Sequence, residues 1–216
     1  MADNLRRLPV YLLLDCSASM SGEPIEALRM GVKALIADLK TDPQALETAY
    51  LSVITFSSSA QQVCPLTELF AFQEPTLEAR GATALGEGLK VLSQCMDNEV
   101  RKSTPTQKGD WKPLVFLFTD GQPTDSWEQA ADQLKQKKIA NIIACAAGPG
   151  ADSTMLKRIT DAEMVVELNN VQPDTLKTFF KWVSSSIKTT SSKLEQSSGD
   201  APLSLPPPPP TIQFVP

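Results

Sequence analysis

Five oxygen-bearing side chains in three separate segments could together bind a hard divalent cation. Asp15 directly follows an apolar run, and hydroxyls occupy alternate positions after it, at Ser17 and Ser19. Asp120 ends a second apolar run, and Thr83 lies on a loop just before a predicted helix. Two carboxylates placed close together repel each other unless a cation lies between them. Because Mg²⁺ prefers oxygen ligands, these five residues predict a magnesium site.

The mixture of ligands also predicts what the metal would do. Two carboxylates are the only charged members of the set, and the other three ligands are neutral hydroxyls. Hydroxyls donate little charge, so the metal stays electrophilic and keeps a position that an outside carboxylate can fill. This chemistry suits the recognition of an acidic side chain on another protein. Mn²⁺ suits the same oxygen ligands, and the sequence does not choose between the two ions.

The hydrophobic pattern predicts the scaffold that would bring these segments together. Short apolar runs alternate with helical patterns, which is typical of a mostly parallel sheet with helices on both faces. We therefore expect a three-layer, Rossmann-like α/β fold. In such folds ligands bind outside the carboxyl ends of the strands, where Asp15 and Asp120 lie. The predicted strands are 10–14, 49–56, 114–118, 139–147 and 164–168, and the predicted helices are 24–42, 84–96, 127–138, 153–159 and 173–187.

The two flanks of this pattern carry separate predictions. The segments 49–56 and 60–66 are joined by a polar turn, which predicts a hairpin whose second strand is a short antiparallel edge. After Lys188 the composition changes, because serine and threonine crowd the segment 184–198 and prolines fill 206–210. We expect one domain over residues 1–188, followed by a flexible, partly polyproline tail over residues 189–216.

Composition narrows the classes of partner and of chemistry. The net charge of -5 argues against nucleic acid and against anionic membrane surfaces, since both require a basic patch. Histidine is absent, which removes the usual general base and the commonest zinc ligand. The start, MADNLRRLP, does not resemble an export signal, and no apolar run approaches the roughly 20 residues of a membrane span. We therefore expect a cytoplasmic protein whose four cysteines are reduced.

Taken together, the three segments resemble a known family. DCSAS at 15–19, GATAL at 81–85 and FTDG at 118–121 are similar to the metal-ion-dependent adhesion site of von Willebrand factor A (VWA) domains, and the resemblance covers roughly residues 8 to 188. It implies that Ser17 and Ser19 bind the metal directly. Thr83, Asp15 and Asp120 would bind it directly or through water. A glutamate or aspartate of a partner protein would complete the coordination shell.

A narrower resemblance concerns the segment FTDGQPTD at 118–125. With the short, cytoplasmic-looking form of the chain, it resembles the bacterial TerY-type proteins of tellurite-resistance and stress-response clusters. That resemblance implies an adaptor linked to a protein kinase and a protein phosphatase. The proline-rich tail is not part of the family pattern.

Two other classes of function stay open. One is an enzyme that uses Mg²⁺ for phosphoryl transfer, since dehalogenase-like phosphatases also place an aspartate after the first strand. These enzymes need a second aspartate two residues later, where this chain has Ser17. The other is a passive scaffold that binds partners through its proline-rich tail. The absence of histidine and of a GxSxG motif argues against a serine hydrolase.

Three residues near the predicted site have competing interpretations. Asp15 by itself could be an ordinary turn or capping residue. Asp125 could support the metal ligands from behind or cap the helix predicted to begin at Trp127. Cys16 alternates away from Asp15 and Ser17, which favours packing over metal binding.

Overall fold

One seven-stranded sheet forms the centre of the computed structural model, which describes residues 6–160, 164–196 and 205–215. Its order is β3-β2-β1-β4-β5-β6-β7, with β1, β2, β4, β5 and β6 parallel and the two outermost strands antiparallel to their neighbours. The predicted fold class is confirmed, with two antiparallel edge strands where the sequence analysis expected one. The strands are β1 (Leu8–Asp15), β2 (Ala49–Phe56), β3 (Ala60–Glu68), β4 (Leu114–Thr119), β5 (Asn141–Ala147), β6 (Val165–Leu168) and β7 (Ile212–Phe214).

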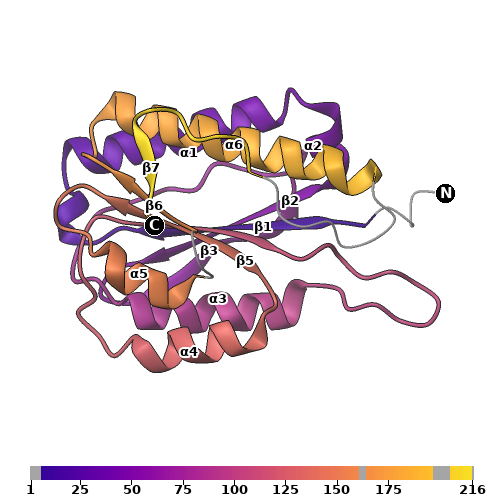
Figure 1. Cartoon of the computed structure of the whole chain (residues 1–216), viewed down its shortest axis with the longest axis horizontal. Helices are drawn as coiled ribbons and strands as arrows, with labels where there is room; N and C mark the ends of the chain where they lie inside the picture. Colours follow the sequence, from indigo (N-terminus) through magenta and orange to yellow (C-terminus); the bar gives the residue numbers. More distant parts are fainter. Residues whose placement is uncertain (1–5, 161–163, 197–204, 216) are drawn as a thin grey trace.

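Helices cover both faces of the sheet, as Figure 1 shows. On one face lie α1 (Glu23–Leu39), α2 (Pro43–Thr48) and α6 (Pro173–Gln196); on the other lie α3 (Leu85–Glu99), α4 (Glu128–Lys137) and α5 (Ser153–Ile159). Strand β1 is apolar up to Leu14 because Leu12 and Leu14 pack into one core while Tyr11 and Leu13 pack into the other.

The short helix α2 is absent from the sequence prediction, which ended a helix at residues 42–43. The same two residues also start the next helix. The Asp42 carboxylate accepts a hydrogen bond from the backbone N–H of Ala45 at 2.9 Å, and Pro43 occupies the first turn, where its missing N–H costs nothing. Asp42 and Pro43 therefore start α2, whereas α1 has already ended at Leu39.

The C-terminal part corrects the expectation of a flexible tail over residues 189–216. Helix α6 continues to Gln196, and Ile212–Phe214 pairs with β6 as the edge strand β7. The indole N–H of Trp182 donates to the carbonyl of Pro206 at 3.1 Å, and its ring meets Phe214 edge-on at 6.0 Å. The proline-rich segment from residue 205 therefore packs on the domain. Residues 197–204 and 216 of the expected tail lie outside the described residues.

The prediction failed because serine and threonine in α6 behave as buried helix residues. Ser186 and Thr190 are buried, and each hydroxyl donates at 2.8 Å to the carbonyl four residues earlier. A hydroxyl satisfied in this way can lie against apolar neighbours without an unpaired polar atom. The pattern of residue types alone resembles a solvated linker.

The position of β1 beside β4 matters most for the site. From β1 the chain turns to one side, to β2 and β3, and then crosses over to β4 on the other side of β1. The register pairs Leu14 with Phe118, so Asp15 and Asp120 both lie just beyond these residues at the carboxyl end of the sheet. Such a reversal of strand order opens the crevice in which α/β folds bind ligands.

None of the helices within the described ranges combines the length and apolarity that crossing a membrane would require.

Candidate metal centre

Asp15 lies fully buried at the end of β1 and is held from two sides. The backbone N–H of Ser17 donates to its Oδ1 at 2.8 Å, and the Thr119 hydroxyl donates to its Oδ2 at 2.6 Å. These bonds fix the plane of the carboxylate. They also leave each oxygen with lone-pair capacity for a further ligand.

A continuous chain of polar contacts joins the first segment to the third. The hydroxyls of Ser17 and Ser19 lie 2.9 Å apart, and Ser19 donates to Oδ1 of Asp120 at 2.8 Å. The turn of 3₁₀ helix at Ala18–Met20 produces this arrangement, because it brings the two hydroxyls together where an extended strand would separate them. The structure therefore brings Asp15, Ser17, Ser19 and Asp120 into one cluster.

Thr83 enters the cluster from the loop before α3. It is buried, and its Oγ1 lies 3.8 Å from the position that a Cβ on Gly121 would occupy. The backbone of Thr83 forms two hydrogen bonds with Thr124. Its N–H donates to Thr124 Oγ1 at 3.1 Å, and its carbonyl accepts from the Thr124 N–H at 2.9 Å. The loop after β4 thus holds Thr83 beside Asp120. All five predicted residues meet at one edge of the sheet.

Asp125 has a function that neither sequence interpretation anticipated. Its carboxylate accepts hydrogen bonds from the backbone N–H groups of Gly86 and Glu87, each at 2.9 Å. It therefore caps α3 from another part of the chain, and the helix beginning near Trp127 has no side-chain cap. Gly86 permits this approach, because a Cβ there would lie 2.7 Å from the carbonyl oxygen of Ser126.

Burial and mutual repulsion act on the two carboxylates. Burial raises the pKa of Asp15 above its ordinary value, hydrogen bonds from Ser17 and Thr119 oppose the rise, and the charge of Asp120 adds to it. Burial likewise raises the pKa of Asp120, against the hydrogen bond from Ser19. Neither aspartate forms an ion pair with any lysine or arginine of the described residues.

The donor set fits a hard divalent cation. It consists of oxygen atoms only, and its two aspartates lack a positively charged partner among the described residues, which a bound cation would supply. No group of three or more histidine, cysteine, aspartate or glutamate side chains is placed to hold a metal in the described part of the chain. A site here would therefore depend on the hydroxyls of Ser17, Ser19 and Thr83.

Sequence reasoning missed two residues that position the site, Thr119 and Thr124. Both lie inside the FTDGQPTD segment that also contains Asp120. Thr119 donates to Asp15 across 104 positions of sequence, and Thr124 holds Thr83 across 41. A polar residue that ends an otherwise apolar strand was the available signal. Cys16 packs in the core beneath the site, as its alternation had indicated.

A family model for the von Willebrand factor type A domain matches residues 10–182 of this chain. Among curated proteins, the chain is similar to an uncharacterized protein, sll0103, of the cyanobacterium Synechocystis sp. The two are 35% identical over 127 residues, which cover 56% of this chain and 27% of the relative. The chain thus spans about a quarter or less of the length of the curated relatives it matches.

Solved structures with the same fold include two proteins with bound metal. Proximal thread matrix protein 1 of the mussel byssus, with a zinc-occupied MIDAS motif, gives a TM-score of 0.60 at 21% identity. That match covers 84% of this chain and 48% of the mussel chain. Manganese-loaded TRAP of Plasmodium vivax gives a TM-score of 0.56 at 18% identity, covering 80% of this chain and 71% of the other. At these identities the likeness concerns the fold.

Proposed function

The chain belongs to the von Willebrand factor type A family, and from this premise we propose that it is a metal-dependent protein-binding module that recognises an acidic side chain of a partner. The observation that carries the proposal is the hydrogen-bonded chain from Ser17 through Ser19 to Asp120, with Asp15 and Thr83 at the same sheet edge. Domains of this family often act as metal-dependent interaction modules.

Each of the five residues has a distinct part in this proposal. Ser17 and Ser19 supply neutral oxygens, and Asp15 and Asp120 supply the negative charge that attracts the cation. Thr83 adds a third hydroxyl from the opposite loop. When bound, the metal supplies an electrophilic position that a partner's glutamate or aspartate completes. Thr119 and Thr124 hold the ligands in place, as hydrogen-bond partners behind metal ligands commonly do.

We propose Mg²⁺ or Mn²⁺ as the ion. Proteins of the same fold, one with zinc in its MIDAS motif and one loaded with manganese, support a divalent metal in general. This site offers oxygen alone, which favours the harder ions, whereas zinc sites in proteins usually include nitrogen or sulfur. Cys16 does not change that preference, because it is buried in the core and burial raises its pKa to about 12, so the thiol stays neutral.

We propose no catalytic role for the site. Phosphoryl transfer of the dehalogenase type would need a second aspartate at position 17, and Ser17 instead lies against the hydroxyl of Ser19. Domains of this family typically serve adhesion or interaction. Binding through the proline-rich segment is the less favoured alternative, since Pro206 and Phe214 are engaged by Trp182 of the same chain.

A finer proposal concerns the biological setting. The segment FTDGQPTD supports a cytoplasmic adaptor in a bacterial tellurite-resistance or stress-response system, with a protein kinase or phosphatase as partner. Co-purification from a bacterium that encodes such a cluster tests this setting separately. Recovery of partners of other kinds only would contradict the setting and leave the metal-dependent module intact.

The central test measures metal binding and partner capture together. Calorimetric titration with Mg²⁺ and Mn²⁺ is expected to show binding by the unaltered chain and none by Asp15→Ala. Partner proteins captured from lysate with Mg²⁺ should elute with EDTA. The control is Glu68→Ala, which removes one acidic group at the opposite end of the hairpin, where Glu68 pairs with Tyr50. Equal metal binding by Asp15→Ala and the unaltered chain would refute the proposal.

A further inference from the structure

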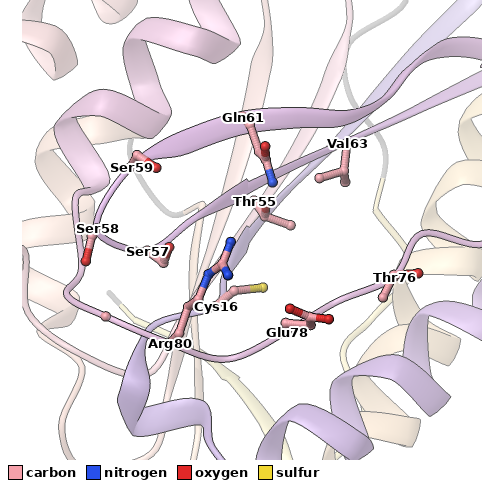
Figure 2. A pocket seen from close by; sticks show the side chains of 11 residues that line it. Cys16, Thr55, Ser57, Ser58, Ser59, Gln61, Val63, Thr76, Glu78 and Arg80 are labelled. Atoms are coloured by element: carbon pink, nitrogen blue, oxygen red, sulfur yellow. The ribbon is translucent and has the colours of Figure 1, made fainter.

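A hollow in the protein surface lies directly beside the candidate metal centre. It has a volume of about 470 Å³ and lies between the β2–β3 hairpin and the segment that leads to Thr83. Figure 2 shows the Arg80 side chain pointing into this hollow toward Thr55 and Gln61. We refer to it as the Arg80 pocket.

The Arg80 pocket and the metal centre share one wall. The backbone N–H of Arg80 donates to the carbonyl of Cys16 at 2.9 Å, and the N–H of Ala18 donates to the carbonyl of Gly81 at 3.0 Å. Cys16 and Ala18 belong to the same turn as Ser17 and Ser19. A ligand seated on the metal would therefore extend naturally over the rim of the Arg80 pocket.

The pocket is built before any ligand arrives. Gly81 has a φ of 74°, and a Cβ at this position would lie 2.2 Å from the hydroxyl oxygen of Ser58. The same hydroxyl accepts a hydrogen bond from Ala82 N at 3.0 Å, and the Ser57 carbonyl accepts one from Ala84 N at 2.7 Å. These contacts hold the Arg80 segment against the hairpin, so binding need not first order the pocket.

The chemistry of the pocket favours an anion. Arg80 is exposed and forms no ion pair or side-chain hydrogen bond with any described residue. The lining adds donors from the hairpin, namely the hydroxyls of Ser57 and Ser59 and the amide of Gln61. Glu78 is the one acidic group among the lining residues, and it is not paired with Arg80. A guanidinium surrounded by neutral donors matches the geometry of a carboxylate.

We propose that the Arg80 pocket is a second subsite, which binds a further acidic side chain of the same partner segment whose first carboxylate completes the metal centre. The inference rests on the proposed function, because the metal places the partner segment over the pocket. The partner motif is accordingly an acidic peptide with two carboxylates at a fixed spacing. Arg80 determines which acidic segments the metal centre accepts.

An array of short peptides tests this inference. Each peptide carries one fixed glutamate, and a single glutamate, glutamine or lysine is stepped through the flanking positions, with Mg²⁺ in the buffer. The unaltered chain should prefer glutamate at one spacing. It should bind that peptide about tenfold more tightly than its glutamine twin, as expected for one charge-assisted hydrogen bond to an exposed arginine.

Variants of the pocket should change this preference in opposite directions. Arg80→Glu should prefer lysine at the same spacing, and Glu78→Gln should strengthen binding of the glutamate peptide. Lys112→Glu is the matched control, since it makes the same charge change just before β4, at the end of the sheet opposite the metal centre. It should behave as the unaltered chain, and circular dichroism checks that every variant is folded.

The outcomes separate this inference from the proposed function. Metal-dependent binding without preference between glutamate and glutamine twins, or with the same preference after Arg80→Glu, overturns the subsite and leaves the metal-dependent module standing. Binding that is unaffected by EDTA and by Asp15→Ala overturns the proposed function, and the subsite with it.

Discussion

At the scale of single residues, the main feature is a buried carboxylate without a positively charged partner among the described residues. Asp15 is fully buried, accepts hydrogen bonds from Ser17 and Thr119, and faces a second carboxylate at Asp120. Burying a charge without a partner is costly. A cation bound as proposed would supply the missing partner, and Thr119 holds the buried carboxylate in its orientation.

Thr119→Val tests this positioning role. The substitution keeps the shape of the side chain but removes the donor to Asp15, so the affinity for Mg²⁺ should fall about tenfold, the lower end of the loss seen when a hydrogen-bond partner behind a metal ligand is removed. Thr119→Ser, which restores the hydroxyl, should recover most of the affinity. Calorimetric titration measures both. Equal affinities for the valine variant and the unaltered chain would show that the hydroxyl is dispensable.

At the scale of elements, loops from distant parts of the chain hold the site together. Asp125, after β4, caps the N-terminus of α3, and Thr124 bonds the backbone of Thr83 just before it. The first turn of α3 has free N–H groups that need acceptors. Because Asp125 supplies them, the start of α3 and the Asp120 loop form one unit.

Asp125→Ala should therefore lower both stability and metal affinity. Losing the cap should cost about 1 kcal/mol of unfolding free energy, a typical value for a helix cap. Asp152→Ala is the matched control, since Asp152 also accepts two backbone hydrogen bonds, from Thr154 and Met155 at the start of α5. Urea unfolding should show similar losses for both variants, and Mg²⁺ titration should be weakened in Asp125→Ala alone. A loss of stability in Asp125→Ala with no loss of metal affinity would separate the cap from the site.

Another pair of elements, α1 and α6, packs closely on one face of the sheet. Gly31 of α1 lies against the ring of Phe180, and a Cβ there would come within 2.3 Å of the ring. The edge of this interface carries Asp38, which pairs with Lys188 at 2.7 Å and also accepts from Ser184. These partners, Lys188 first, hold the pKa of Asp38 below its ordinary value.

Asp38→Asn should show how this ion pair contributes at different pH. Because the folded-state pKa is lowered, the stabilisation is present above the unfolded value of about 3.9 and is lost as the pH falls through the folded value. Half of the Asp38 side chain is exposed, so the loss at pH 7 should be only about 0.5–1 kcal/mol.

Urea unfolding from neutral to acidic pH measures this effect. The difference between Asp38→Asn and the unaltered chain should narrow below pH of about 4. Glu74→Gln serves as a control, because Glu74 and Lys33 form an exposed pair at 3.9 Å that should contribute little. A difference that persists unchanged in acid would mean that packing, not charge, is affected at Asp38.

At the scale of the whole molecule, the C-terminal segment of the chain extends the sheet by one short edge strand. Strand β7 covers the edge of β6 and buries Ile212, and Trp182 of α6 contacts the proline-rich segment that precedes it. An uncovered edge strand offers unpaired backbone groups to other chains. The segment 205–215 is thus a structural part of the domain.

Deleting residues 205–216 should lower the unfolding free energy by about 2–4 kcal/mol, as for loss of a large buried side chain. It should also promote self-association through β6. Gln213→Ala, which changes an exposed residue of the same strand, should alter neither property. Urea unfolding and light scattering measure the two effects.

The affinity of the shortened chain for Mg²⁺ should not change, because two strands separate β7 from β4. A fall in that affinity would implicate the segment in the site.

The sequence alone determined the fold class and the location of the site. Apolar runs such as 10–14 and 114–118 indicate strands buried on both faces, because burial acts on every residue of such a strand. Parallel strands present their carboxyl ends at one edge, so aspartates at positions 15 and 120 had to lie near one another once the strands were neighbours. The structure shows that proximity, and metal binding by the five residues stays a prediction.

Tertiary structure alone decided how that site is supported and how the chain ends. One of the two partners of Asp15, and the side chains that hold Thr83 and cap α3, come from residues dozens of positions away, and no local pattern specifies which loops will meet. The hydroxyl-rich end of α6 and the strand β7 resemble a linker locally, and only tertiary packing gives them structure: α6 packs on α1 and α2, and β7 pairs with β6. Periodicity reports the environment of one element, whereas hydrogen bonds between loops depend on the relative placement of several.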